Sequence, residues 1–156
     1  VELDPNDWIL TRFKARSAFF DGPPKLVAIE PAPGAHLPAG QPLSMTVTFH
    51  RDVVAADTDF VLRRSDGLEY GLDVIYDAAT YTATLTTQEP LTFGRFQLIV
   101  DDDIVDAEDG IALDGELDQV HDGSLPSGDG LAGGDAVIHY HALGLRRANR
   151  RLAPAP

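Results

Sequence analysis

The stretch that decides the fold of this chain is Leu43-Ser44-Met45-Thr46-Val47-Thr48-Phe49, in which apolar and polar residues alternate without interruption. A period of two residues is typical of a β-strand that is buried on one face. The apolar residues of this stretch are expected to face a core. The Ser and Thr residues between them are expected to face water, as in an antiparallel sheet with one solvated side.

Similar alternation returns at short intervals along the chain. It predicts strands within 60–62, 70–76, 81–85, 96–100 and 136–141, and a short apolar run at 25–29 adds another. The turn sequence Ser65-Asp66-Gly67 predicts a hairpin between the runs 60–62 and 70–76. About seven short strands with turn signals between them, and no helical pattern, predict an all-β fold, an immunoglobulin-like antiparallel β-sandwich.

The apolar phases of these strands define the expected core. A register shift of one residue would turn each of these side chains to water, so the expected register places all of them in the core. A charged substitution at such a buried position is expected to unfold the domain. The expected core residues are Met45, Val47, Phe49, Leu62, Leu72, Val74, Leu85, Leu98 and Ile138.

The length of 156 residues suits one domain with extensions. We expect residues 1–24 to be a linker or the end of a preceding domain, because they close on Asp21-Gly22-Pro23-Pro24. The sandwich is expected over 25–143 and includes a long acidic loop at 101–135. Residues 144–156, with four arginines and Ala-Pro repeats, are expected to form a flexible basic tail.

The net charge of −13 argues against nucleic-acid binding, because an acidic surface cannot displace counterions from phosphates. The sequence has no apolar run of about 18 residues or more, so we expect no membrane span. The chain also lacks cysteine, which excludes disulfides and thiolate metal sites.

The acidic loop is the main candidate for a binding site. Residues 101–135 contain ten aspartates and two glutamates, and calcium binds through six to eight oxygen ligands. The spacing does not match an EF-hand, and a solvated acidic face is the alternative interpretation. The candidate calcium ligands are Asp101, Asp102, Asp103, Asp106, Asp109 and Asp114.

Other chemistry has less support in the sequence. His139 and His141 lie two apart on an expected strand and could share a transition metal, although such a pair more often marks an outer face. The sequence contains neither Gly-x-Ser-x-Gly nor His-Glu-x-x-His, so we expect no enzymatic activity. Four aromatic residues could form a sugar-stacking face, which leaves a carbohydrate-binding module as an alternative. They are Tyr70, Tyr76, Tyr81 and Phe93.

The segments 27–35 and 43–53, each a strand next to a Pro-rich turn, resemble the opening of bacterial Ig-like domains of the type first described in S-layer proteins. The segments 90–100 and 105–115 resemble the second signature of that family, with Phe96 in place of its usual tyrosine. The resemblance covers roughly residues 25–143. It implies a non-catalytic spacer, adhesion or accessory module of a larger secreted or cell-surface bacterial protein, whose partners are neighbouring domains or cell-surface components.

The first ten residues, Val1-Glu2-Leu3-Asp4-Pro5-Asn6-Asp7-Trp8-Ile9-Leu10, resemble the closing segment of the β domain in aminopeptidase-N-like zinc metallopeptidases. This resemblance implies an alternative role as a C-terminal accessory domain of a secreted peptidase whose catalytic domain lies upstream.

Overall fold

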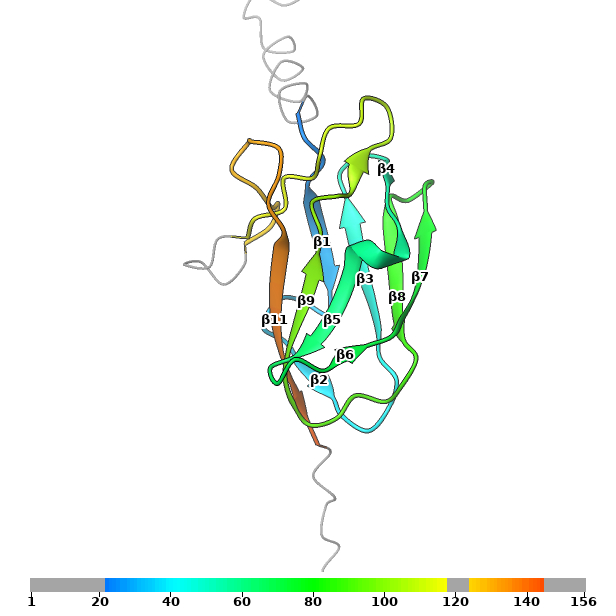
Figure 1. Cartoon of the computed structure of the whole chain (residues 1–156), viewed down its shortest axis with the longest axis vertical. Coiled ribbons are helices and arrows are strands. Elements are labelled where there is room, and N and C mark those ends of the chain that lie inside the picture. The colour runs from blue at the N-terminus through cyan, green and yellow to red at the C-terminus, as the bar shows by residue number, and fades with distance from the viewer. Residues whose placement is uncertain (1–21, 118–123, 145–156) are drawn as a thin grey trace, which may run out of the picture.

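A computed structural model describes residues 22–117 and 124–144 as a sandwich of two β-sheets (Figure 1). In spatial order, the four-stranded sheet consists of β1 (Leu26–Glu30), β3 (Ser44–Phe49), β8 (Thr82–Thr87) and β7 (Leu72–Asp77). The five-stranded sheet consists of β2 (His36–Pro38), β11 (Ala136–Leu143), β9 (Gly94–Val100), β5 (Phe60–Arg64) and β6 (Glu69–Tyr70).

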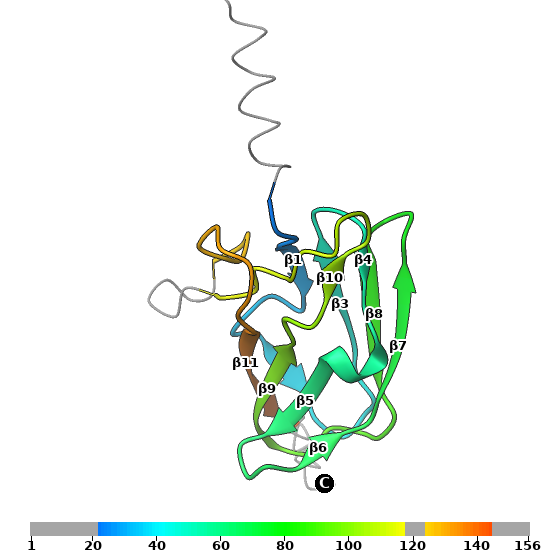
Figure 2. The ribbon, with the colours of Figure 1, turned by 45° about the horizontal axis from the view of Figure 1, so that its top comes forward.

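Two smaller elements complete the described structure. A ribbon pairs β4 (Val53–Val54) with β10 (Val105–Asp106), and the single 3-10 turn η1 (Asp57–Asp59) precedes β5. Figures 1 and 2 show this ribbon at the same end of the sandwich as the acidic loop. In the described residues, no helix is long and apolar enough to cross a bilayer.

The order of the strands is that of an immunoglobulin fold, in which strands A, B, E and D form one sheet and C, F and G the other. Here β1, β3, β8 and β7 take the places of A, B, E and D, and β5, β9 and β11 take those of C, F and G. The predicted fold class is therefore confirmed. One pairing is not antiparallel, because β2 runs parallel to β11.

The predicted register of β3 is correct. Met45, Val47 and Phe49 are at most 1% exposed and lie between the two sheets. The core predictions at Leu62, Leu85, Leu98 and Ile138 are equally buried. Leu72 and Val74 are only half-buried, although both pack against the core. They belong to β7, which lies at the edge of its sheet and so lacks a neighbouring strand on one side.

The outer face of the four-stranded sheet is a ladder of hydroxyl side chains. Ser44 lies opposite Thr86, and the two pairs that follow along β3 and β8 are both Thr–Thr pairs. The last of these pairs is joined by a hydrogen bond of 3.0 Å between Thr48 Oγ1 and Thr82 Oγ1. Hydroxyl pairs across antiparallel strands stabilise a sheet while keeping its outer face wet.

The hairpin predicted over residues 60–76 is shorter than expected. The turn at Ser65-Asp66-Gly67 joins β5 only to β6, and the chain then crosses at Gly71 to become β7 in the other sheet. Gly71 suits this crossing because a Cβ there would overlap the side chain of Gln88. The alternation continues across the crossing because β6 and β7 both point their apolar residues into the same core. Periodicity alone therefore could not reveal the change of sheet.

The turn between β7 and β8 is organised by one carboxylate. Asp77 accepts hydrogen bonds from the backbone N–H of Ala79 at 2.9 Å and from the hydroxyl of Thr80 at 3.0 Å. Tyr81, which the alternating pattern placed in the following strand, instead lies in this turn with a positive φ of 55°. Its side chain is exposed, so the buried phase of β8 begins at Ala83.

The described parts of the acidic loop, residues 101–117 and 124–135, are packed against one end of the sandwich. Ile104 and Leu113 are fully buried, and the backbone N–H of Leu113 donates to the carbonyl oxygen of Ile104 at 2.8 Å. Leu117, the last described residue before the gap, is also buried. These apolar anchors explain how a loop of this length and charge is held to the domain.

The described chain enters and leaves the sandwich at opposite ends. Residue 22 leads into β1 at the end that carries the acidic loop, and β11 ends at Leu143 at the other end (Figures 1 and 2). Of the predicted linker (1–24) and the predicted tail (144–156), residues 1–21 and 145–156 lie outside the described residues.

The register of β3 can be tested with two Asp substitutions in that strand. Val47→Asp should unfold the domain, because it places a charge at a fully buried position between the sheets. Ser44→Asp, at an exposed position of the same strand, should melt within a few degrees of the parent. Circular dichroism during heating measures both. A Val47→Asp protein that melts with the parent would contradict the register.

Candidate functional site

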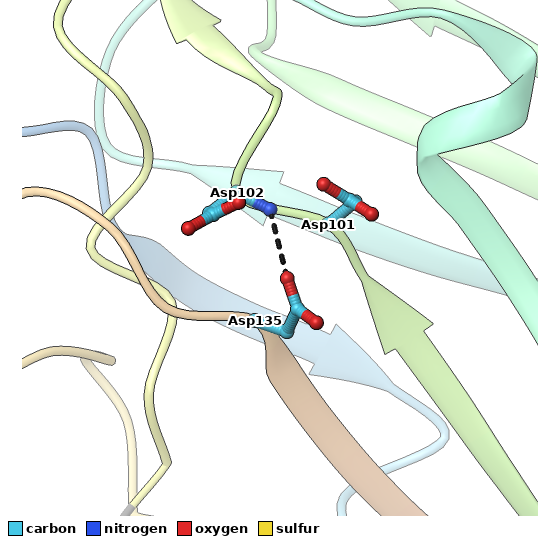
Figure 3. Close-up of side chains that lie close together, drawn as sticks. All are labelled: Asp101, Asp102 and Asp135. Atoms are coloured by element: carbon cyan, nitrogen blue, oxygen red, sulfur yellow. Dashed lines mark hydrogen bonds between the residues drawn. The ribbon is translucent and has the colours of Figure 1, made fainter.

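The acidic loop brings three aspartates together at one end of the five-stranded sheet, beside the neighbouring strands β9 and β11. Asp101 and Asp102 follow β9, Asp135 precedes β11, and their carboxylates offer oxygens within 4.8 Å of one another (Figure 3). The backbone N–H of Asp102 donates to Asp135 Oδ1 at 3.2 Å, which is the dashed line in Figure 3. Asp102 Oδ2 in turn accepts the N–H of Gly134 at 2.7 Å. Asp135 was missed by the sequence prediction.

A second group contains Asp114, Glu116 and Asp129. Asp114 is fully buried, and its Oδ2 forms an ion pair of 2.9 Å with Lys25 Nζ. Its carboxylate also accepts the backbone N–H of Asp129 at 3.0 Å and that of Gly130 at 2.8 Å. A buried carboxylate is stable only when paired and hydrogen-bonded, and Asp114 meets both conditions without a metal ion.

Ser127 extends this buried group to the first strand. Its hydroxyl donates to the carbonyl oxygen of Asp114 at 2.6 Å and accepts the backbone N–H of Leu26 at 2.9 Å. The backbone N–H of Asp114 donates to the carbonyl oxygen of Pro24 at 2.9 Å. The Asp114 group therefore fastens the start of β1 to two parts of the acidic loop that are distant in sequence.

Two glycines make room for the carboxylates of this group. Gly128 has φ of +87°, and a Cβ there would overlap the carboxyl group of Asp114. Gly134 has φ of +92°, and a Cβ there would overlap the carboxyl group of Glu116. Burial raises the pKa of Glu116, and its side-chain hydrogen bond with Asp114 raises it further.

Asp106 occupies a third, separate environment. It is buried, and its Oδ2 accepts a hydrogen bond of 2.7 Å from Nη1 of Arg51. Its Oδ1 accepts the backbone N–H groups of Glu108 at 2.7 Å and Asp109 at 3.1 Å. Burial by itself would raise the pKa of Asp106, but these N–H donors and the Arg51 charge outweigh burial and lower it. Arg51 Nη1 also donates to the carbonyl oxygen of Gly22.

The six candidate calcium ligands are thus not brought to one point. Asp101 and Asp102 are adjacent, Asp106 and Asp114 are held in separate buried networks, and Asp103 and Asp109 are exposed. Calcium takes six to eight oxygens, and the group of Asp101, Asp102 and Asp135 offers three carboxylates. Calcium binding in this loop stays a prediction, and this group is the place to test it.

The histidines and aromatic residues take other positions. His139 and His141 are exposed on the outer face of β11, and His141 lies opposite His36 of β2 with ring centroids 6.2 Å apart. The sequence offered no sign of this partner, because β2 and β11 are about 100 residues apart. His121 and the tail arginines lie outside the described residues.

Of the four proposed sugar-stacking aromatics, Tyr70 and Tyr76 pack inward, whereas Tyr81 and Phe93 are exposed. Tyr70 is buried and packs edge-to-face on Phe96, with ring centroids 5.4 Å apart. Tyr76 packs on Phe49, and its hydroxyl donates to Asp52 at 2.8 Å. Burial, followed by this bond to Asp52, raises the pKa of Tyr76 to about 12. Its ring is therefore part of the core rather than of a ligand platform.

The fold and this arrangement define the class of the protein as an immunoglobulin-like β-sandwich with a carboxylate-rich loop packed on one end. The chain matches no family model and no curated protein sequence.

The role of Asp114 can be tested by removing its charge. Asp114→Asn should lower the free energy of unfolding by about 3 kcal/mol, because it breaks a buried ion pair and turns an amide toward two backbone N–H donors. Asp103→Asn is the matched control at an exposed position and should change stability by less than about 0.5 kcal/mol. Urea denaturation measures both, and equal stabilities for the two variants would contradict the fastening role.

The lowered pKa of Asp106 predicts how acid affects stability. Because its pKa in the folded state lies below the ordinary value of 3.8, its contribution is complete above pH 3.8 and is lost as the pH falls through the folded-state pKa. The parent protein should therefore lose more stability below pH 3.8 than Asp106→Asn, which has no carboxylate to protonate. Urea titrations at several acidic pH values measure the two slopes. If the unfolding free energies of the parent and the variant fall equally with pH, the protonation of Asp106 does not contribute to the loss of stability.

Proposed function

We propose that this chain is a non-catalytic, Ig-like spacer or adhesion module of a larger secreted or cell-surface bacterial protein. The observation that carries the proposal is that the described chain enters the sandwich at one end and leaves it at the other. A module connected in this way separates whatever precedes it from whatever follows it by its full length. The immunoglobulin-like strand order of the two sheets supports a relationship to the bacterial Ig-like domains that the sequence resembles.

The carboxylates of the acidic loop support a structural role. Asp114 and Asp106 accept hydrogen bonds on both of their oxygens, and each is paired with a cation. A carboxylate that serves as a nucleophile or general base needs an oxygen free to meet a substrate. These two residues instead connect the loop to Lys25 and Arg51, near the point where the described chain enters.

A second observation supports transmission of force through the module. β1 lies beside β3 in one sheet, whereas β11 lies beside β9 in the other, so the two ends of the module belong to different sheets. Pulling on these ends loads both sheets and the core between them. The ion pair of Lys25 with Asp114 fastens the start of β1 to the loop that leads into β11, and it would resist peeling of that strand.

Single-molecule pulling on the full chain tests the spacer role. Extension between the two ends should show one abrupt unfolding event, which releases roughly 120 residues at about 3.5 Å each, or about 400 Å of chain. Asp114→Asn should unfold at lower force than Asp103→Asn, because it removes the attachment of β1. Extension without a distinct event would refute a mechanically stiff spacer.

The proposal also predicts that the purified chain does not catalyse hydrolysis. Peptidase, glycosidase and esterase substrates should all be turned over at background rate, since no nucleophile, base and orienting group are assembled in the described residues. Turnover that survives repurification and disappears in Asp101→Asn would overturn the non-catalytic assignment.

A further inference from the structure

The outer face of the five-stranded sheet carries an arginine and histidines, whereas the domain as a whole is acidic. Of the five Lys and Arg residues in the described ranges, Lys25, Arg51 and Arg64 are in ion pairs with aspartates. Arg95 forms no ion pair with any described residue and is exposed in β9. It lies directly opposite His141 of β11, which itself lies opposite His36 of β2.

Arg95 and His141 line a shallow hollow in the sheet face. Its lining consists of Ser65, Arg95, Phe96, Gln97, His139, Tyr140 and His141, and it includes no carboxylate. Phe96 and Tyr140 are buried beneath it and form its floor. The other lining side chains carry a guanidinium, two imidazoles, an amide and a hydroxyl, all of which can donate hydrogen bonds.

The nearest carboxylates on this side of the sheet are either paired with an arginine or separated from the hollow. Asp66, beside Ser65, is paired with Arg64. Glu69 of β6 lies opposite Arg63 of β5 at the far edge of the sheet, two strands beyond β9. Asp135 lies four residues before His139, roughly 13 Å away along β11 and beyond the screening length of about 8 Å at physiological ionic strength. An anion in the hollow therefore meets the Arg95 guanidinium and other hydrogen-bond donors, and no carboxylate lines the hollow.

A guanidinium beside the imidazoles favours an anion over a metal ion. Arg95 is always positively charged, so it repels a cation placed between it and His141. The same guanidinium forms short, charge-assisted hydrogen bonds with carboxylates, and imidazole N–H groups can add to them. The spacing of His139 and His141 suggested a metal site, but Arg95 beside them makes a site for an oxyanion the better interpretation.

The extent of the face indicates a ligand with several hydrogen-bond acceptors. His36, His141 and Arg95 lie on three successive strands, which span about 10 Å at 4.8 Å per strand. Gln97 and Ser65 place neutral polar groups beside them. We propose that this face binds an acidic polysaccharide, whose carboxylates meet Arg95 and the histidines while its hydroxyls meet Gln97 and Ser65.

Calorimetric titration of the full chain with a galacturonic acid hexamer at low ionic strength tests the proposal. Arg95→Gln should weaken binding by about tenfold or more, the effect of losing a strong charge-assisted contact. Ser44→Asp changes the net charge by the same amount on the outer face of the other sheet and should leave the affinity within about twofold. Both positions are exposed, so both variants should fold, which thermal melting verifies.

The remaining outcomes are also decisive. Absence of binding to the hexamer, or equal weakening by Arg95→Gln and Ser44→Asp, would overturn the site. Equal binding of a neutral galactose hexamer would overturn the role of the carboxylates, and equal binding of a glutamate hexapeptide would overturn the choice of a polysaccharide. The result is separable from the spacer role, since a chain that resists pulling but ignores the hexamer refutes only this inference.

Discussion

Burial of one shared core between the two sheets is the constraint on which the rest of the structure depends. Val47 and Leu85 from one sheet and Leu62 and Leu98 from the other are all completely inaccessible to solvent. Each of these side chains is buried only if its strand keeps the correct phase, because a slip of one residue exposes the whole apolar set. The core therefore fixes the register of every central strand at once, and polar residues are left to the two outer faces.

A small number of buried charges connect the acidic loop to the strands that enclose this core. Asp114 and Asp106 lie at the end of the sandwich where Ile104 and Leu113 also anchor the acidic loop in the core. Each is stabilised by a cation and by backbone N–H groups, which offset the cost of removing a carboxylate from water. The acidic composition of residues 101–135 is thus partly structural, and Asp101, Asp102 and Asp135 form a group in which no carboxylate is buried.

The distribution of charge gives the domain distinct functional surfaces. Carboxylates gather at the end where the described chain enters, hydroxyls cover the outer face of the four-stranded sheet, and Arg95 with three histidines occupies the outer face of the other sheet. A spacer needs only the core and its two ends. The presence of Arg95 and three histidines together on one face is not required for that role, and it is the reason for assigning that face a ligand.

The sequence by itself determined the strands and their buried phases, because alternation with a period of two reports directly which side chains leave water. Val47, Leu98 and Ile138 could be placed in this way, as could the all-β class. Tertiary structure alone decided the sheet to which each strand belongs, since β6 and β7 share one apolar phase across the change of sheet at Gly71. It also decided the partners of isolated polar residues. His36 meets His141, Lys25 meets Asp114 and Asp135 joins Asp101 only because strands distant in sequence become neighbours, and a local pattern carries no record of such long-range pairing.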